Sequence, residues 1–473
     1  MSMDRRDFLK GTAWMGVLAA TAGCASGRFG FGTGGSMQGF ASKPMKRVRV
    51  AFSGVGGRGS AAVRRVSAIP GVEVVALNDR VESKIRANAD WLNGKGLPEP
   101  KAFGGEEGWK ALCDWDGADV VYVASPWALH APTALRAMRN GKIPLVEVPS
   151  ALTLDECWDL VETSEETRIP CMQLENCCYG EIEMLEFNMA KLGVLGELTH
   201  AEGAYIHDLR HMTNPEAVGE AEWRYFENRD HKGNRYPTHG LVPICLMMDV
   251  NRGDCFDYLV SLESQQANFK AYMKAKFPQG NLRAADEVAM GDMNVTLVKT
   301  VRGRSIMVQH DVSSPRPYNR LALVSGTLGT VGDYPFRVAL SEKPGDAAHA
   351  WFDEAKTREI REKYRHPLWK KVGEIAKKVG GHGGMDFLMD LRWAYCLQNG
   401  LPLDTDVYDL ASWCAVSELT EKSARNRSQA MDIPDFTRGV WKTPCNSNLM
   451  DATLDLSKID FGSVGKAEGQ LSV

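Results

Sequence analysis

The residues from Gly54 to Gly59 have the types and spacing needed to hold a phosphate chain. They read Gly54-Val-Gly56-Gly57-Arg58-Gly59, which matches the pattern G-x-G-x-x-G. Such glycines allow a tight turn and bring backbone close to a pyrophosphate, whose charge is stabilised by the N-terminus of the next helix. Asp79 lies downstream at the place where an acidic side chain accepts hydrogen bonds from an adenosine ribose. Together these residues predict a bound dinucleotide, with NAD favoured over NADP.

The flanking residues predict the elements that this motif requires. Residues 48–53 are apolar-rich and typical of a buried strand, residues 60–69 have helical periodicity, and residues 72–77 form a second strand that ends at Asn78-Asp79. The same alternation continues through strands at 119–125, 143–149 and 171–174 and helices at 131–140 and 155–167. It predicts a parallel sheet with right-handed crossovers, an α/β Rossmann dinucleotide-binding domain over residues 46–178.

Ligands of open parallel sheets bind at the carboxyl ends of the strands. The strand at 119–125 ends in Pro126-Trp127-Ala128-Leu129-His130, so we expect Trp127 and His130 to face the cofactor. The following strand carries Glu147-Val148-Pro149, and the last one ends at Glu175-Asn176. Thr153 is expected to cap the helix at 155–167.

After Tyr179 the pattern changes, and we expect a second, α+β domain over residues 179–440. Strand-like runs predict an open, mostly antiparallel sheet; they cover residues 197–205, 258–262, 292–300, 305–311 and 322–325. The charged stretch 356–378 is expected to be a largely helical, solvated insertion with a break at Pro367. A late helix near 406–427 is expected to pack back on the core, and 441–473 to form a tail. On the helix at 181–192, three glutamates are expected to form a solvated face: Glu181, Glu183 and Glu186.

Composition limits the function classes. The chain has 473 residues, 44% of them apolar, a formal charge of −4 and a pI near 6.2. Such a chain can bury two full-sized cores, and it lacks the basic excess of a general nucleic-acid binder. Its 11 cysteines show no zinc-like pairing and are interpreted mainly as small buried residues. His207 and His211 have helical ligand spacing, but nothing completes a metal shell, so no metal site is predicted.

The N-terminus predicts export. Asp4-Arg5-Arg6-Asp7-Phe8-Leu9-Lys10 is similar to the twin-arginine motif, and a short apolar segment follows it. We therefore expect a signal peptide at residues 1–30, recognition by the Tat export machinery, export of the folded protein with its cofactor, and a periplasmic location. Thr21-Ala-Gly-Cys24 resembles a degenerate lipobox, which leaves a lipid anchor at Cys24 open. Residues 31–45 are expected to be a flexible linker.

Several of these residues together resemble the Gfo/Idh/MocA oxidoreductases. The resemblance rests on the glycine motif, Asp79, the proline-marked strand end at Pro126 and Glu147-Val148-Pro149. Ordinary members carry Glu-Lys-Pro at the last of these, where the lysine serves the hydride-transfer site. Val148 therefore counts against a plain sugar dehydrogenase.

Four further runs are similar to one branch, glycoside hydrolase family 109, the NAD-dependent α-N-acetylgalactosaminidases. They are Trp127-Ala-Leu-His130, Tyr236-Pro-Thr-His239-Gly240, Asn251-Arg-Gly-Asp254 and Pro315-Arg-Pro-Tyr318-Asn319. That branch also has twin-arginine leaders and a valine in place of the lysine.

The resemblance implies a set of site residues. The cofactor would be held by Gly54, Gly56, Gly57, Arg58, Gly59, Asp79, Trp127, Ala128, Leu129, His130, Glu147, Val148, Asn176 and Tyr236. Within this set, Gly57 and Arg58 would touch the pyrophosphate. The sugar would face Tyr205, Arg224, Tyr236, Pro237, Thr238, His239 and Tyr318.

The chemistry implied is hydrolysis with retention by oxidation at C3, elimination of the aglycone, addition of water and reduction, with NAD regenerated. His239 would deprotonate the C3 hydroxyl, and a cap by Thr238 would lower its pKa. Tyr179 and Tyr236 are candidates for the other proton transfers, although a tyrosine acting as a base needs a lowered pKa. An exported NAD(P)-dependent sugar dehydrogenase or oxidoreductase is the alternative, and a non-catalytic sugar-binding lipoprotein is a third reading. The galacto or gluco and α or β preference, the residue that removes the C2 proton, and a homo-oligomeric state are left open.

Overall fold

The structure is a computed structural model that describes residues 35–212, 222–278, 286–343, 345–346, 349–444 and 449. The predicted leader at 1–30, with Cys24, lies outside these residues, as do 445–448 and 450–473 of the predicted tail. Within the described part, none of the helices combines the length and apolarity needed to cross a bilayer. The nine cysteines found there are all buried and free of disulfide bonds.

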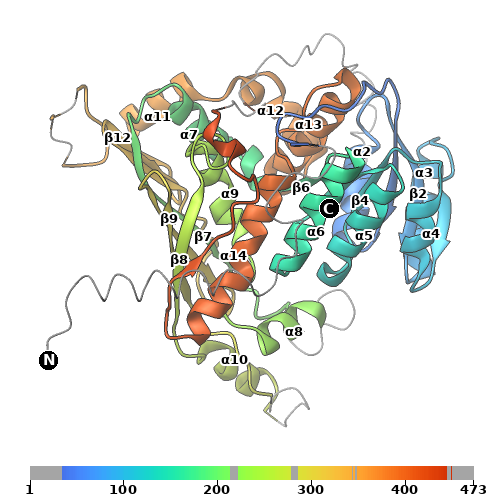
Figure 1. Cartoon of the computed structure of the whole chain (residues 1–473), viewed down its shortest axis with the longest axis horizontal. Coiled ribbons are helices and arrows are strands. Elements are labelled where there is room, and N and C mark those ends of the chain that lie inside the picture. Colours follow the sequence, from blue (N-terminus) through green and yellow to red (C-terminus); the bar gives the residue numbers. More distant parts are fainter. Residues whose placement is uncertain are drawn as a thin grey trace, which may run out of the picture.

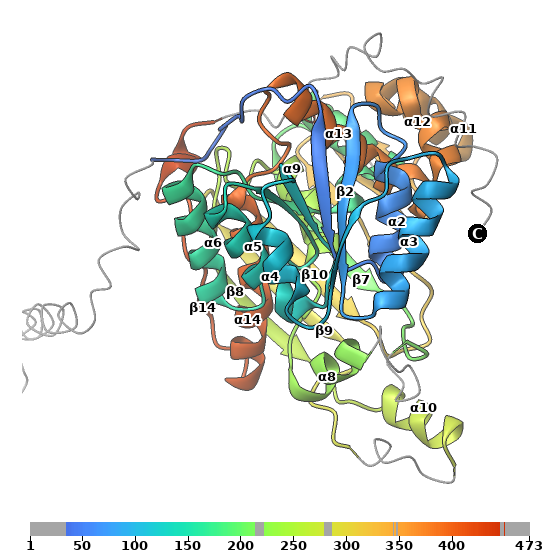
Figure 2. The same cartoon turned by 90° about the vertical axis from the view of Figure 1, so that its right-hand side faces the viewer.

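The N-terminal half is a six-stranded parallel sheet in the order β3-β2-β1-β4-β5-β6. Its strands are β1 (Val48–Ser53), β2 (Val72–Asp79), β3 (Lys101–Gly104), β4 (Val120–Val123), β5 (Ile143–Glu147) and β6 (Met172–Leu174). Figure 2 shows α2 (Gly57–Val66) and α3 (Glu82–Gly94) on one face, and α4 (Gly108–Asp114), α5 (His130–Arg139) and α6 (Leu154–Thr167) on the other. The predicted Rossmann fold is confirmed. Strands β4 and β5 are buried throughout because helices cover both faces.

The C-terminal half is built on an eight-stranded sheet in the order β13-β12-β11-β7-β10-β9-β8-β14. Its strands are β7 (Leu198–Ile206), β8 (Phe256–Glu263), β9 (Asn294–Thr300), β10 (Ser305–Asp311), β11 (Leu323–Gly326), β12 (Gly329–Gly332), β13 (Arg337–Leu340) and β14 (Met431–Asp432). The pair β7–β10 is parallel and the other pairs are antiparallel, which confirms the mostly antiparallel prediction. The helices α9 (Thr238–Met247) and α14 (Val407–Arg425) pack against this sheet (Figure 1). The last of these is the predicted late helix, and it also packs on α6.

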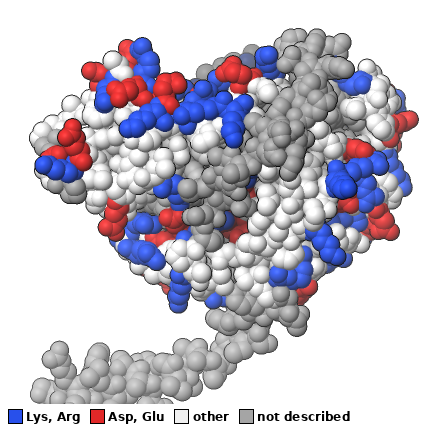
Figure 3. Space-filling model, turned by 90° about the horizontal axis from the view of Figure 1, so that it is seen from above, with Lys and Arg blue, Asp and Glu red and all other residues white. Residues whose placement is uncertain are grey.

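The remaining helical elements lie at the boundary of the two halves or on the C-terminal half. They are η1 (Trp127–Leu129), η2 (Asn176–Tyr179), α7 (Glu181–Lys191), α8 (Glu222–Asp230), α10 (Asn268–Lys276), α11 (Glu354–Tyr364), α12 (Pro367–Val379), η4 (His382–Gly384), α13 (Met385–Asn399) and η5 (Val440–Lys442). On the face seen in Figure 3, Lys and Arg side chains lie beside Asp and Glu rather than forming one broad basic surface.

The expectation of a flexible linker at 31–45 is wrong for the part that the structure describes. From residue 35 onward the segment lies on the core. Met37 is buried and its N–H donates to the Tyr408 hydroxyl at 2.9 Å. The Arg168 guanidinium donates to Gly35 O at 2.8 Å. The prediction of flexibility came from the glycine content of the segment. The buried Met37 side chain and these two hydrogen bonds instead hold it on the core.

The expectation of a solvated insertion at 356–378 is also wrong. The break falls at Arg365-His366, directly before Pro367 as predicted, but α12 buries one full face. Leu368, Trp369 and Val372 are buried there, and the Trp369 indole N–H donates to Tyr179 O at 3.0 Å. The abundant lysines of α12 lie on its exposed face and hid this apolar stripe.

Helix α13 was not predicted from the sequence. It follows α12 in the C-terminal half but packs against α2 and β1 of the nucleotide-binding half. Twelve of its fifteen residues are buried, so it lacks the one-sided apolar pattern by which a surface helix is recognised. It carries two acidic residues, Asp386 and Asp390, into the boundary between the two halves.

Thr153 caps α6 as predicted, because its side chain accepts a hydrogen bond from Glu156 N at 3.1 Å. We expect Thr153→Ala to lower the free energy of unfolding by about 1 kcal/mol, since an N-cap hydroxyl is worth roughly that much. Urea unfolding followed by circular dichroism measures the loss. Thr153→Ser keeps the oxygen and is expected to restore most of the stability; equal losses in the two variants would contradict the capping role.

Candidate active site

The carboxyl edge of the parallel sheet has the geometry of a dinucleotide site. Gly54 has φ +90°, and a Cβ added there would lie 2.6 Å from Ser125 N; one added at Gly59 would lie 2.0 Å from Gly54 O. A residue with a Cβ would clash at either position, so both Gly54 and Gly59 have to be glycine. Helix α2 begins at exposed Gly57 without a side-chain cap, an N-terminus suited to a phosphate. Asp79, at the end of β2, accepts from Val55 N at 3.1 Å and from Val81 N at 2.9 Å. The residues present therefore fit NAD.

The other predicted cofactor residues follow β4, β5 and β6 at the same edge. Trp127 packs against Trp223 and Tyr236, with ring centroids 4.3 and 5.5 Å apart. Ala128 is exposed and Leu129 half-buried in η1. Val148 is buried in the apolar cluster that contains Trp127 and Tyr205.

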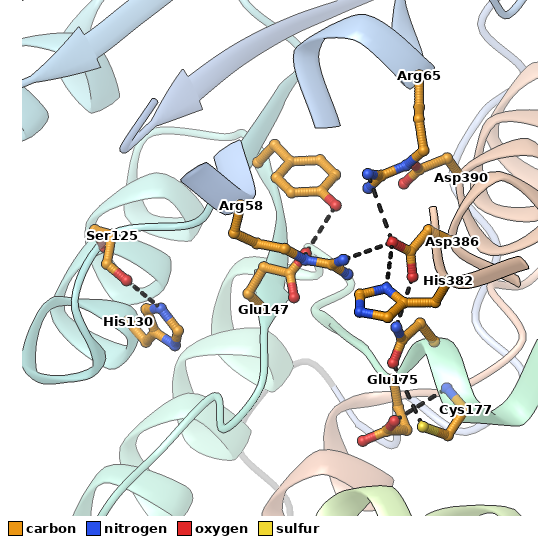
Figure 4. Close-up of polar contacts among 12 residues, drawn as sticks. Arg58, Arg65, Ser125, His130, Glu147, Glu175, Cys177, His382, Asp386 and Asp390 are labelled. Atoms are coloured by element: carbon orange, nitrogen blue, oxygen red, sulfur yellow. Dashed lines mark hydrogen bonds and ion pairs between the residues drawn. The ribbon is translucent and has the colours of Figure 1, made fainter. Parts of the chain in front are cut away.

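The expectation that His130 faces the cofactor is wrong. Its ring is buried, with Nδ1 2.8 Å from Pro149 O and Nε2 2.7 Å from Ser125 O (Figure 4). Burial lowers the pKa of His130, although both carbonyl oxygens oppose the shift. The side chain therefore ties the end of β4 to the turn after Glu147, and it is structural.

Arg58 directs its guanidinium at two carboxylates rather than outward. Nε donates to Glu147 Oε1 at 2.7 Å, and Nη1 donates to Asp386 Oδ2 at 2.6 Å. The Tyr122 hydroxyl also donates to Glu147 Oε1, at 3.0 Å. The second oxygen of Asp386 accepts from the Asn176 amide at 2.6 Å. Figure 4 shows Arg58, Arg65 and His382 converging on Asp386. Two predicted cofactor residues, Arg58 and Asn176, are thus held by a carboxylate from α13.

A cavity of about 480 Å³ lies between this edge and the C-terminal sheet. Predicted sugar-facing and catalytic residues line it together with residues that the sequence did not indicate. The lining includes Asn176, Gly180, Glu181, Ile182, Glu183, Tyr205, His207, His239, Tyr318, Arg320, Asp333, Arg361, Trp369, His382, Gly383 and Met385.

His239, in the first turn of α9, is paired with a buried carboxylate. Its Nδ1 lies 2.7 Å from Glu175 Oε1, and its Nε2 lies 3.5 Å from the Tyr236 hydroxyl. Although burial opposes ionisation, the His239 ring holds the pKa of Glu175 below its usual value. A carboxylate this close behind an imidazole is an arrangement found where the ring acts as a general base.

Aromatic rings form the wall beside His239. Tyr205 lies edge-on to His239, with centroids 5.3 Å apart, and edge-on to Tyr318 at 6.2 Å. The Tyr318 hydroxyl accepts from Arg320 Nη1 at 2.8 Å, and Arg320 is ion-paired with Glu183. The predicted sugar residues Tyr205, His239 and Tyr318 are therefore brought together on one surface.

The solvated face expected for α7 is wrong for two of its glutamates, since Glu183 and Glu186 are buried. Burial, together with the nearby Glu183 charge, raises the pKa of Glu186 well above its usual value. Only Glu181 is half-buried at the cavity rim, with its Oε1 2.9 Å from Arg365 Nε.

Tyr179 is not placed for proton transfer. It is buried away from the cavity lining, and its hydroxyl donates to Asp404 Oδ2 at 2.9 Å. Burial and the Asp404 charge raise the pKa of Tyr179 well above the usual value.

Burial likewise raises the pKa of Tyr236. A tyrosine acting as a base needs a lowered pKa, so Tyr236 is a hydrogen-bond donor and not a base.

Thr238 does not cap α9. It is itself the first residue of the helix, Pro237 occupies the N-cap, and no side-chain cap bond is formed.

Arg224 lies outside the cavity lining, with its guanidinium 4.5 Å from the Trp223 ring centre and 5.7 Å from that of Tyr236. It stacks on the cluster that supports the sugar-facing wall.

The sequence reading missed Glu175 as a partner of His239, the Glu183–Arg320 pair, and the His382–Asp386 pair. Glu175 stands at a predicted strand end, which was the available signal. The glycine run around His382 was a second one, since four glycines flank it in Gly380-Gly381-His382-Gly383-Gly384. Nothing in the sequence distinguishes Glu183, which is ion-paired with Arg320, from Glu181 and Glu186 on the same helix.

Glu175, Cys177 and His239 place three potential metal-ligating atoms within 4.8 Å of one another. Burial raises the pKa of the Cys177 thiol well above its usual value, although Arg320 opposes the shift. This works against the thiolate that a metal would require. The Glu175–His239 pair is already explained by proton transfer, so we assign no metal here.

Two family models match the chain. The NAD-binding Rossmann fold of the GFO/IDH/MocA oxidoreductase family matches residues 48–173, and the C-terminal domain of glycosyl hydrolase 109 matches residues 179–443. A family 109 protein from Solibacter usitatus (strain Ellin6076) is 45% identical over 450 residues, 93% of this chain and 98% of that protein. The chain belongs to glycoside hydrolase family 109.

Other family 109 proteins have a similar level of identity to this glycosidase. Family 109 protein 1 of Bacteroides fragilis (strain YCH46) is 44% identical over 406 residues, 83% of this chain and 86% of that protein. Solved structures share the fold at low identity. Levoglucosan dehydrogenase with NADH and levoglucosan has a TM-score of 0.63 at 18% identity, covering 82% of this chain and all (100%) of its own. The WlbA dehydrogenase of Bordetella pertussis, in complex with NADH and UDP-GlcNAcA, has a TM-score of 0.56 at 14% identity, covering 83% and 99%.

Asp79→Ala is expected to yield protein that loses its NAD during purification, because it removes the carboxylate placed for the ribose and its bond to Val55 N. Nucleotide content, measured by absorbance and by enzymatic assay of extracts, checks this. Glu82→Ala, an exposed acid in the first turn of α3, is the matched control and should retain NAD. An Asp79 variant with full NAD content would contradict the assignment.

Glu175→Gln is expected to lower kcat by about a hundredfold, since positioned acid–base groups contribute roughly that much or more. NAD content should be unchanged. Glu186→Gln is the matched control, because Glu186 is a buried glutamate that does not line the cavity; it should keep most of the activity. Equal kcat values for the Glu175 variant and the unaltered enzyme would show that Glu175 does not support His239.

Proposed function

We propose that this family 109 glycosidase hydrolyses terminal α-N-acetylgalactosaminides with retention, using NAD as a cofactor that is regenerated in each turnover. The observation that carries the proposal is the His239–Glu175 pair on the wall of the cavity beside the dinucleotide edge. It supplies a general base next to the place where the fold holds an oxidant.

Proton transfer at the sugar falls to residues of the C-terminal half. NAD, when bound, supplies reversible hydride acceptance at C3, which acidifies the proton at C2. His239 takes the proton of the C3 hydroxyl through Nε2, because Nδ1 faces Glu175. The carboxylate stabilises the imidazolium that forms.

Tyr236 completes this relay. Its hydroxyl lies 3.5 Å from His239 Nε2, and its raised pKa keeps it protonated. Tyr236 is not among the residues that line the cavity, so its hydroxyl would act on the sugar through His239. Tyr318, whose hydroxyl is held by Arg320, offers a fixed phenol on the cavity wall itself.

Val148 supports this proposal over the alternative of a sugar dehydrogenase. The side chain lies in an apolar cluster with Trp127 and Tyr205, where it can neither donate nor accept a proton. The task that a lysine performs in ordinary Gfo/Idh/MocA members is thus left to His239.

We also propose export of the folded enzyme by the twin-arginine pathway to the periplasm, from the leader motif at Arg5-Arg6.

The reaction class can be tested with p-nitrophenyl α- and β-N-acetylhexosaminides in D₂O. We expect nitrophenol release from the α-galacto substrate, deuterium at C2 of the released sugar by NMR, and no net NADH. His239→Ala should abolish turnover and keep its NAD.

The other outcomes identify other chemistries. NADH accumulation without nitrophenol would indicate a sugar oxidoreductase. Cleavage without deuterium at C2 would move the chemistry to cavity carboxylates such as Glu183 and Asp333, and it would overturn the proposed route.

A further inference from the structure

The loop between α12 and α13 has a backbone that few sequences can adopt. Five successive residues have positive φ: Gly380 at 92°, Gly381 at 85°, His382 at 47°, Gly383 at 72° and Gly384 at 105°. A side chain in this left-handed region costs free energy, and histidine is the one residue of the five that carries it. Such a conformation persists where the surrounding structure fixes it, and it is common at ligand sites.

Two of the glycines are also required by space. A Cβ at Gly381 would lie 2.6 Å from Asp386 Cβ, and one at Gly384 would lie 2.7 Å from Ala376 C. The loop is therefore pressed against the end of α12 and the start of α13. The close approach at Gly381 is what allows the loop to reach Asp386.

The side chain that this loop presents is His382. It is 63% exposed and lines the cavity together with Asn176 and His239. Its Nδ1 lies 2.9 Å from Asp386 Oδ2, which leaves the Nε2 edge of the ring for a ligand (Figure 4). An exposed imidazole held by a buried carboxylate is oriented before any ligand arrives.

Asp386 joins His382 to the cofactor residues. The same Oδ2 accepts from Arg58 in the first turn of α2, and Oδ1 accepts from Asn176 after β6. Although burial opposes ionisation, Arg58, the His382 bond and Arg65 hold the pKa of Asp386 well below its usual range. Asp386 is thus a fixed negative charge beside the glycine turn, and it orients the His382 ring.

We propose that loop 380–384 is a cofactor clamp in which His382, oriented by Asp386, donates to the phosphate-bearing part of NAD from outside the Rossmann domain and slows its release. Binding of one ligand would account for the positive φ angles of the loop, for the His382–Asp386 pair and for the link from Asp386 to Arg58. It rests on NAD binding, and its purpose follows from the proposed function, since a recycled cofactor has to stay bound.

Charge supports a phosphate-bearing group as the occupant. Arg58 donates to Glu147 and Asp386, and Arg65 donates to Asp390 at 2.9 Å. Both guanidinium groups are thereby committed to carboxylates. Among the described nitrogen donors of this network, His382 is the one with a largely exposed side chain. A pyrophosphate at the start of α2 would meet it as the remaining exposed donor.

The test measures NAD release and involves no glycoside. Enzyme loaded with NAD is desalted, and released NAD is trapped by alcohol dehydrogenase with excess ethanol and followed as NADH absorbance. His382→Asn suits the loop because asparagine tolerates left-handed backbone while its amide is too short to reach the same ligand. We expect His382→Asn and Asp386→Asn to release NAD about ten- to a hundredfold faster, the effect of one lost hydrogen bond to a charged group.

Asp390→Asn is the matched control. Asp390 lies one turn further along α13, is equally buried and also pairs with an arginine, Arg65, so its amide removes a comparable buried ion pair. It should release NAD at the rate of the unaltered enzyme. Unchanged release from the His382 and Asp386 variants would overturn the clamp, as would equally fast release from the Asp390 variant, which would point to α13 stability. Loss of glycosidase activity alone bears on the proposed function and not on this assay.

Discussion

A single buried carboxylate, that of Asp386, joins the two halves of the molecule. Its oxygens receive Arg58 from α2, Asn176 from the end of β6 and His382 from the loop before α13. Removing an ion from water costs several kcal/mol, on the order of the stability of a whole domain, unless its lone pairs are filled by charged or polar donors. Asp386 meets that condition only when the nucleotide-binding and C-terminal halves are both in place. The pairing therefore fixes how the cavity is formed, and it belongs to neither half alone.

This constraint explains why the cavity contains two different kinds of wall. On the C-terminal side, aromatic rings of Tyr205 and Tyr318 stand around His239, and Arg320 fixes the Tyr318 hydroxyl. On the nucleotide side, the glycine turn and the carboxylate network leave polar edges and little apolar surface. A sugar stacks on rings and donates from its hydroxyls, whereas a dinucleotide needs close backbone and charge. Each ligand finds its chemistry on a different side of one space.

The sequence predicts the first half of this arrangement far better than the second. A glycine turn between a strand and a helix has a local physical cause, so Gly54, Gly59 and Asp79 could be placed from pattern alone. His239 and Tyr205 were found by family resemblance and then brought together by the fold. Helix α13 gave no signal because it is buried nearly all round, and Asp386 could not be paired with Arg58 at a sequence separation of 328. The predictions that α12 and the glutamates of α7 are solvated were wrong, because a polar residue type does not reveal which face of a helix is buried.

Two successive residues at the end of β6 organise both imidazoles of the cavity. Glu175 pairs with His239, and Asn176 donates to Asp386, which holds His382. Side chains of adjacent residues leaving a strand point in different directions, so one strand end can serve a base on one wall and a cofactor contact on the other. A shift of β6 would displace both partners together. Strand β6 lies at the edge of the sheet and pairs in parallel with β5, so this one pairing positions both Glu175 and Asn176. The register of this short strand therefore acts together with the Asp386 contacts in placing both imidazoles at one cavity.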